Sequence, residues 1–166
     1  MTQTNMPRNL LSAGIAALLA VAMLAQTSRL LAAPGAWRDP VTGLAIGGYD
    51  PVAYFTHKAP KLGRESVEHR WGGAVWRFVN INNRDAFAKH PEIYMPGFAG
   101  YDARALAEGL TVEGLPVVWA IYKQRVYLFR DAASLRKWQR DRKKITAMAQ
   151  ANWARLAKEL PGKVER

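Results

Sequence analysis

Two stretches of the chain alternate apolar and polar side chains with the period of a β-strand. In residues 67–79 the alternation continues on both sides of Gly72-Gly73, which predicts two short strands joined by a tight turn. In residues 117–130, β-branched and aromatic residues flank Lys123-Gln124-Arg125, which predicts a second hairpin whose turn lacks glycine. The pattern therefore predicts antiparallel strands connected by short turns.

Helix signals follow each of these hairpins. Asparagines between residues 80 and 83 can cap a short helix over residues 84–89, which ends before Pro91. From Asp131 onward, apolar residues recur at helical spacing and predict one long helix that ends at Pro161-Gly162. The stripe comprises Leu135, Trp138, Ile145, Ala149, Asn152, Trp153 and Leu156, all of them apolar except Asn152. No internal repeat is visible. We predict an α+β fold with a small antiparallel sheet of hairpins, short helices, and the long C-terminal helix packed on the sheet.

A glycine-rich segment precedes a further predicted helix. Gly97 and Gly100 lead into Tyr101-Asp102, and a short helical run follows until Gly109. Aspartate is a preferred N-cap, so this carboxylate is expected to accept hydrogen bonds from the backbone N–H groups of residues 104 and 105. Glycines also let a ligand approach the backbone, and nearby tyrosine hydroxyls could face it. The candidate ligand-binding residues are Tyr49, Tyr54, Tyr101 and Asp102.

Residues 1–33 have the pattern of an export signal. Arg8 is the only charged residue among residues 1–9, and residues 10–25 are apolar except for Ser12 and Gly14. This run is long for a cleaved signal peptide and short for a bilayer span of about 20 residues. We expect either cleavage near Ala33 or an uncleaved N-terminal anchor, followed by a single domain over residues 34–166. Either form places the domain most simply in a bacterial periplasm, on the inner membrane if the anchor is kept.

The composition limits the chemistry of such a domain. The chain has 166 residues and no cysteine, which excludes disulfides and thiolate metal sites. Its net charge is +11, and all but Arg8 and Arg29 of the 24 Lys and Arg lie beyond residue 33, with all 13 acidic residues. For an exported protein, this charge favours anionic lipid headgroups, cell-wall polymers or an acidic partner protein over nucleic acid. Simple solubility is the alternative.

Part of the positive charge is concentrated on the predicted C-terminal helix, where Asp141 is the only acid within the run. The basic residues are Arg136, Lys137, Arg140, Arg142, Lys143 and Lys144. A run of this kind is usually a solvated helix face. Its density also suits contact with an anionic membrane surface.

The segment Gly48-Tyr-Asp-Pro-Val-Ala-Tyr-Phe55 resembles the opening motif of small exported bacterial proteins of the YHS-domain family. The resemblance continues through residues 71–78, 83–87 and 91–94 into Gly100-Tyr101, and it covers about residues 39–157. It implies a YHS-like domain over residues 34–166 with a metal-binding role. Related sequences carry cysteines near the positions of Val79, Asn83 and Asp102, whereas this chain has none.

The residues that remain for a metal ion are imidazoles and carboxylates, and the candidates are His69, His90 and Asp102. No serine-nucleophile, phosphate-loop or zinc-helix motif indicates an enzyme. The sequence therefore predicts a non-catalytic, exported binding domain for a metal ion or small ligand, and it names no cofactor. The alternative is an interaction protein that uses its basic helix at an anionic membrane surface or on an acidic partner.

Overall fold

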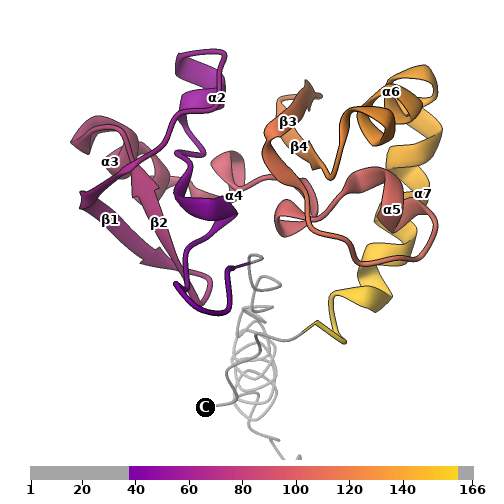
Figure 1. The fold of residues 1–166 in the computed structure, drawn as a ribbon, viewed down its shortest axis with the longest axis horizontal. Helices are drawn as coiled ribbons and strands as arrows, with labels where there is room; N and C mark the ends of the chain where they lie inside the picture. Colours follow the sequence, from indigo (N-terminus) through magenta and orange to yellow (C-terminus); the bar gives the residue numbers. More distant parts are fainter. Residues whose placement is uncertain (1–37, 161–166) are drawn as a thin grey trace, which may run out of the picture. The chain divides into compact units, whose positions relative to one another are not determined.

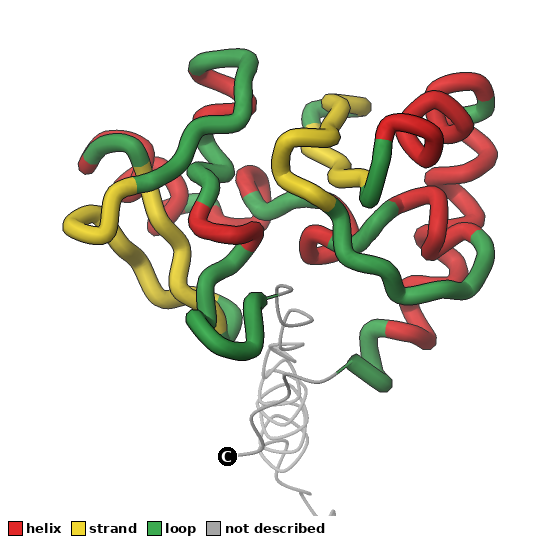
Figure 2. Tube along the Cα trace, viewed as in Figure 1, coloured by secondary structure: helices red, strands yellow, loops and turns green. Residues whose placement is uncertain are grey.

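Two antiparallel hairpins supply the strands of the structure, a computed structural model that describes residues 38–160 (Figures 1 and 2). β1 (Arg64–Trp71) pairs with β2 (Ala74–Phe78), and β3 (Leu115–Tyr122) pairs with β4 (Arg125–Phe129). Together with short helices and a long C-terminal helix, they confirm the predicted α+β fold. The predicted leader over residues 1–33 and the helix end at Pro161-Gly162 lie outside the described residues.

The same order of elements occurs twice along the chain. In the first half, η1 (Ile46–Gly48) and α2 (Ala53–Thr56) precede the hairpin, and α3 (Ile81–Lys89) and α4 (Pro91–Tyr94) follow it. In the second half, η2 (Gly97–Gly100) and α5 (Ala103–Ala107) precede the hairpin, and α6 (Ala132–Arg140) and α7 (Arg142–Leu156) follow it. We name residues 44–94 the first repeat and residues 96–145 the second repeat. The interpretation that the chain has no internal repeat is wrong.

Backbone contacts recur at equivalent positions of the two repeats. Gly63 donates its N–H to the carbonyl of Gly48 at 2.9 Å, and Gly114 donates to Gly100 at 3.0 Å. Gly48 and Gly100 both have positive φ, at 77° and 95°, a conformation that glycine adopts without steric cost. The two turns that lead from the first helices toward the strands are therefore built in the same way.

Both hairpins also carry the same irregularity in their pairing. The register shifts between Arg64 and Glu68 of β1, and it shifts between Leu115 and Trp119 of β3. A bulge of this kind bends a strand and increases its local twist. Its recurrence shows that the two hairpins share their shape as well as their order.

The predicted continuous C-terminal helix is in fact two helices, because the backbone leaves the helical region at Asp141 (φ −140°, ψ 39°). His90 produces the same break between α3 and α4, with φ −141° and ψ 58°. α4 has 4 residues and stops before Pro96, whereas α7 has 15 residues and continues beyond the second repeat. The break belongs to the repeated unit, and the extension of α7 is specific to the second copy.

Each repeat buries large side chains between its hairpin and the helix that follows. In the first repeat these are Trp76, Phe78 and Phe87, and in the second repeat they are Tyr127, Phe129 and Trp138. We name these clusters the first core and the second core. The predicted apolar stripe lies in the second core, where Leu135, Ile145, Ala149, Trp153 and Leu156 also pack. The periodicity of these residues was therefore a correct signal for burial.

The outer face of the second hairpin packs against the first repeat. Val126 and Leu128 are fully buried in the first core, and Trp119 packs against the same cluster. The ring of Tyr54 in α2 meets the ring of Trp119 at 5.2 Å, edge to face. The Tyr54 hydroxyl donates a hydrogen bond to the carbonyl of Pro116 at 2.9 Å. The second hairpin thus packs against α2 of the first repeat.

α7 covers the corresponding part of the second repeat. Leu106 of α5 is the counterpart of Tyr54, and it is fully buried in the core that α7 helps to form. The Asn152 side-chain amide of α7 donates to the carbonyls of Leu106 and Ala107 at 2.8 and 3.2 Å. The extension of α7 therefore occupies on α5 the place that the second hairpin occupies on α2.

Candidate functional site

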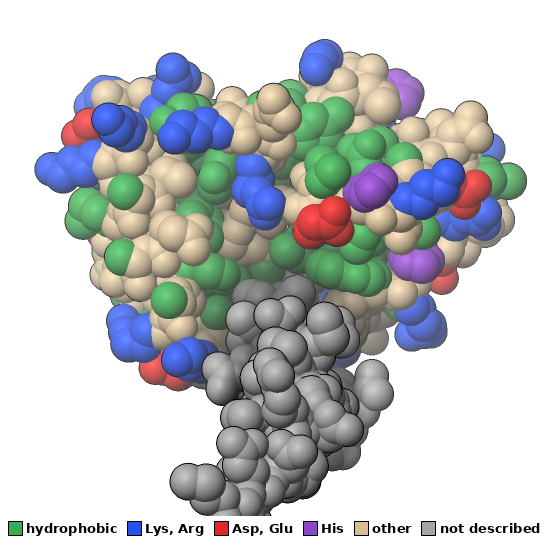
Figure 3. Space-filling model, turned by 180° about the vertical axis from the view of Figure 1, so that it is seen from behind, with side chains coloured by type: hydrophobic (Ala, Val, Ile, Leu, Met, Phe, Trp, Pro, Cys, Tyr) green, Lys and Arg blue, Asp and Glu red, His purple; other side chains and the backbone are tan. Residues whose placement is uncertain are grey.

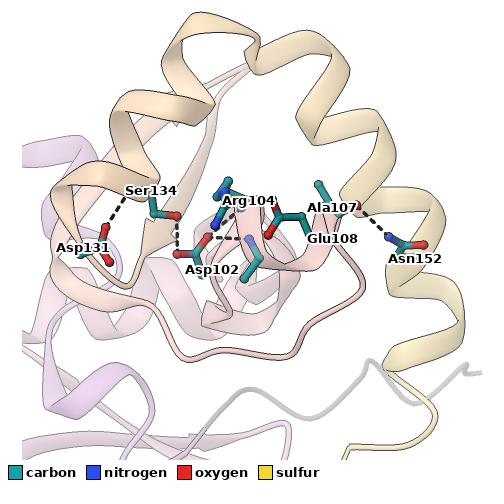
Figure 4. Close-up of polar contacts among 8 residues, drawn as sticks. Asp102, Arg104, Ala107, Glu108, Asp131, Ser134 and Asn152 are labelled. Carbon is teal, nitrogen blue, oxygen red and sulfur yellow. Dashed lines mark hydrogen bonds and ion pairs between the residues drawn. The ribbon is translucent and has the colours of Figure 1, made fainter.

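Asp102 lies at the start of α5, is fully buried, and accepts four hydrogen bonds, of which those from α5 and from Ser134 are drawn in Figure 4. Its Oδ1 accepts from the backbone N–H groups of Arg104 and Ala105 at 2.7 and 3.0 Å, which confirms the predicted N-cap. Its Oδ2 accepts from the N–H of Arg130 at 2.8 Å and from the Ser134 hydroxyl at 2.6 Å. The carboxylate therefore ties α5 to the turn between β4 and α6.

Asp50 makes the equivalent set of contacts in the first repeat. Its Oδ1 accepts from the N–H groups of Val52 and Ala53 at 2.8 and 3.2 Å. Its Oδ2 accepts from the N–H of Val79 at 2.9 Å and from the Asn83 amide at 2.7 Å. Because one buried carboxylate holds the same junction in each repeat, the four bonds are a property of the fold.

Sequence reasoning found Asp102 and missed Asp50 and the two side-chain donors, Asn83 and Ser134. A signal was present, because Gly-Tyr-Asp occurs at residues 48–50 and again at residues 100–102. The positions of the donors follow only once the two segments are aligned. A ligand-binding role for Asp102 stays a prediction, and the described contacts commit both of its oxygens to the fold.

The candidate tyrosines belong to two different cores, with Tyr49 and Tyr54 in the first and Tyr101 in the second. Tyr54 is fully buried, and burial raises the pKa of its hydroxyl above the ordinary value. Tyr101 is 8% exposed and packs on Trp153 with ring centroids 5.9 Å apart, and burial raises its pKa as well. Tyr49 is half-buried beside the first core. These rings are explained by packing, and their ligand-binding role stays a prediction.

The metal candidates make contacts of other kinds in the described structure. His69 lies edge to face on Phe87, with centroids 6.2 Å apart, and His90 is exposed with its Nδ1 3.6 Å from a carboxylate oxygen of Glu92. Within residues 38–160, no three or more His, Cys, Asp or Glu side chains gather as metal ligands would. His69, His90 and Asp102 are therefore not brought together in one coordination site.

The predicted basic residues all lie at the junction of α6 and α7 and are all exposed. We name this surface the basic corner; it comprises Arg136, Lys137, Arg140, Arg142, Lys143 and Lys144. Seen from behind in Figure 3, Lys and Arg side chains gather at the end of the domain that carries these helices. The guanidinium of Arg142 lies 5.2 Å from the ring centroid of Tyr122, and Lys123 lies 5.6 Å from the same centroid. The basic corner thus continues onto the β3–β4 turn.

The ion pairs of the second half involve arginines that lie outside the basic corner. Arg104, Arg130 and Arg155 each form an ion pair with a neighbouring carboxylate. None of the basic-corner side chains forms an ion pair with any residue of the described range 38–160. Apart from Arg142, which lies over the Tyr122 ring, their charge is therefore directed to solvent.

These features define a small two-repeat α+β domain with a group of exposed cations at one helix junction. In comparisons with known proteins, no family model, no curated protein and no solved structure matches the chain. The resemblance to YHS-domain proteins stays a prediction that rests on the motifs alone.

Proposed function

We propose that this protein is an exported, non-catalytic, YHS-like interaction domain that binds an anionic membrane surface through the basic corner. The supporting observation is that six exposed cations lie together at one helix junction without an ion pair in the described residues. Charges that the fold needed would be paired or partly buried, as Arg104 is. An anionic surface supplies what these cations lack.

The energetics suit a peripheral contact. Each Lys or Arg near an anionic leaflet contributes about 1 kcal/mol, and the attraction decays over a Debye length of roughly 8 Å at physiological salt. Several cations at one corner can approach the headgroups together, so their contributions combine at short range. The binding should therefore be strong at low salt and weaken steeply as salt is added.

The predicted leader would make a weak contact sufficient. If residues 1–33 stay as an anchor, the domain is held near the bilayer, and its second contact becomes intramolecular. None of the helices between residues 38 and 160 has the length and hydropathy of a membrane-spanning segment. In this proposal the domain itself lies on the surface.

The test is co-sedimentation of residues 32–166, which form one compact unit, with vesicles of phosphatidylcholine or of phosphatidylcholine mixed with phosphatidylglycerol. The reversal variant is Arg140→Glu/Lys143→Glu, and the matched control, Lys61→Glu/Lys89→Glu, changes the charge of the first repeat equally. We expect the reversal to weaken binding to anionic vesicles at least tenfold and the control to leave most of it. Absence of pelleting at low salt would refute the proposal, as would equal losses in both variants.

A further inference from the structure

An open groove of about 280 Å³ lies where α5 faces the junction of α6 and α7. Its apolar side is formed by Ala107, Ile145 and Met148, of which Met148 is 45% exposed. Three cations from three helices line it: Arg104, Lys137 and Lys144. The groove therefore combines a small apolar wall with a cationic rim.

Two carboxylates, those of Glu108 and Asp141, also line the groove. Glu108 is the ion-pair partner of Arg104, so these two charges offset each other. Asp141 carries one negative charge, and Lys137 and Lys144 carry two positive charges. The charged side chains that line the groove therefore sum to one net positive charge. A ligand with a single negative charge matches this balance better than a dianion does.

The first repeat shows that the fold does not require these groups. At the position of Ala107 it has Phe55, whose ring packs edge to face on Tyr94 with centroids 5.8 Å apart. The second repeat has a methyl group there and has a hollow. The groove thus exists because a large ring of the repeated unit is absent from the second copy.

The cations of the groove differ between the repeats in the same way. The counterparts of Arg104, Lys137 and Lys144 in the first repeat are uncharged: Val52, Ala86 and Ile93. Three positions that are uncharged in the first repeat are therefore cationic in the second, around the position where the first repeat has a ring and the second has a methyl group. Packing alone gives no reason for this combination, whereas a small anionic ligand does.

We propose that this groove binds the phosphodiester headgroup of an anionic phospholipid, with Lys137 and Lys144 at the phosphate and Met148 at the glycerol carbons. The inference rests on the proposed function and makes it specific, because one headgroup would be held in a site within the diffuse contact of the basic corner. A phosphodiester carries the single charge that the groove balances. Its neighbouring carbon atoms suit the apolar wall.

The experiment follows the methionine methyl signals of the full chain in neutral detergent by NMR, with Met148→Leu used to assign Met148. The probe is glycerophosphoglycerol, the headgroup of phosphatidylglycerol without its acyl chains. We expect a saturable shift at Met148 and none at Met95. Lys137→Gln/Lys144→Gln should weaken this binding at least tenfold, whereas the matched variant Arg136→Gln/Arg140→Gln, outside the groove, should change it less than twofold.

Several outcomes would contradict the proposal that the groove binds this headgroup. One is the absence of a saturable Met148 shift, and another is equal weakening by the two double variants, which would mean diffuse attraction. A third is inorganic phosphate acting with the same affinity as the headgroup, which would assign the groove to a simple anion. If the protein binds vesicles but shows no Met148 shift, the headgroup site in the groove is contradicted and the proposed membrane function is kept. A Met148 shift that persists without vesicle binding supports the groove and overturns the proposed membrane function.

Discussion

The two repeats of this chain share their polar junctions and differ in their outer surfaces. Asp50 and Asp102 hold the same four-bond junction, and both copies carry the same strand bulge and the same helix break. The outer hairpin faces differ in polarity, and the second repeat has a groove beside α5. The comparison separates what the fold requires from what each copy adds, because a feature that is missing from one working copy is not needed to fold the other.

The outer hairpin faces show the difference most clearly. On the second hairpin, Trp119 and Leu128 are apolar and pack on the first repeat. Their counterparts on the first hairpin are Glu68 and Arg77, which form an ion pair at 2.9 Å. The outer face of the second hairpin is thus an interface between the repeats, whereas that of the first hairpin carries a charged pair. The position of each copy in the chain, rather than the fold, decides which kind of face it needs.

The largest expected effect comes from removing the shared carboxylates. Asp50→Ala and Asp102→Ala each leave buried N–H donors without an acceptor, at about 1–3 kcal/mol for each such group, so each variant should lose at least about 3 kcal/mol of unfolding free energy. Chemical denaturation measures this loss. The control is Asp39→Ala, because the Asp39 carboxylate bonds within an exposed turn. If one of the two aspartates were replaced without loss, the junctions would not be equivalent.

A second effect concerns the outer hairpin faces. Leu128→Arg places an unpaired cation in the first core and should cost roughly 3 kcal/mol or more, by loss of apolar burial and by desolvation. The reciprocal variant, Glu68→Trp/Arg77→Leu, should change the stability little and should create an exposed apolar patch that promotes self-association. Denaturation and light scattering test the two variants. A monomeric reciprocal variant would show that this face cannot act as an interface.

A smaller effect is expected at the hairpin turns. The first turn has Gly72 and Gly73 at positive φ, and the second has Lys123 and Gln124 at φ 48° and 58°. Glycine tolerates this region, whereas side chains there cost on the order of 1 kcal/mol. Lys123→Gly/Gln124→Gly should therefore raise the unfolding free energy by about 1 kcal/mol. An unchanged or lowered value in thermal unfolding would mean that the side chains compensate for the strain.

The smallest effect distinguishes the helix caps by pH. Asn80 caps α3 and Asp131 caps α6, so only the second cap titrates. The Ser134 N–H, and then the Arg130 side chain, hold the pKa of Asp131 below its ordinary value of 3.8. Its stabilising contribution is complete above that value and is lost as the pH falls through the lower folded pKa.

Amide exchange at Ser134 and at its counterpart Asn83 measures this difference. Acid should loosen the start of α6 before the start of α3. Asp131→Asn should remove the Asp131 part of this dependence while keeping a cap. If the variant and the parent protein responded identically to acid, Asp131 would not be the group responsible.

Local features of this structure could be predicted from the sequence. The alternation around Gly72-Gly73 and around residues 123–125 predicted both hairpins. The position of Asp102 before a helical run predicted that it caps α5. The apolar spacing of Trp138, Ile145 and Ala149 gave the buried stripe. In each case the interacting groups are close in sequence, so periodicity and capping rules apply directly.

Features that depend on distant segments could not be predicted in this way. Ser134 reaches Asp102 across 32 residues, and the break at Asp141 is masked by an apolar spacing that fits one helix. The repeat was missed because the copies share Gly-Tyr-Asp but differ at most core positions, such as Phe87 and Trp138. The groove depends on Ala107 standing where the first copy has Phe55, and this comparison needs the aligned structures.

The packing of the second hairpin on α2 has a consequence for assembly. The two surfaces in this contact are different, so the contact is heterologous, and units joined by such contacts alone would add one after another into a ring or an open filament. In this chain the extended α7 blocks the next acceptor surface, and the charged pair Glu68–Arg77 replaces an apolar donor surface at the other end. Within residues 38–160, neither end of the pair of repeats therefore offers the surface that a further contact of this kind would need.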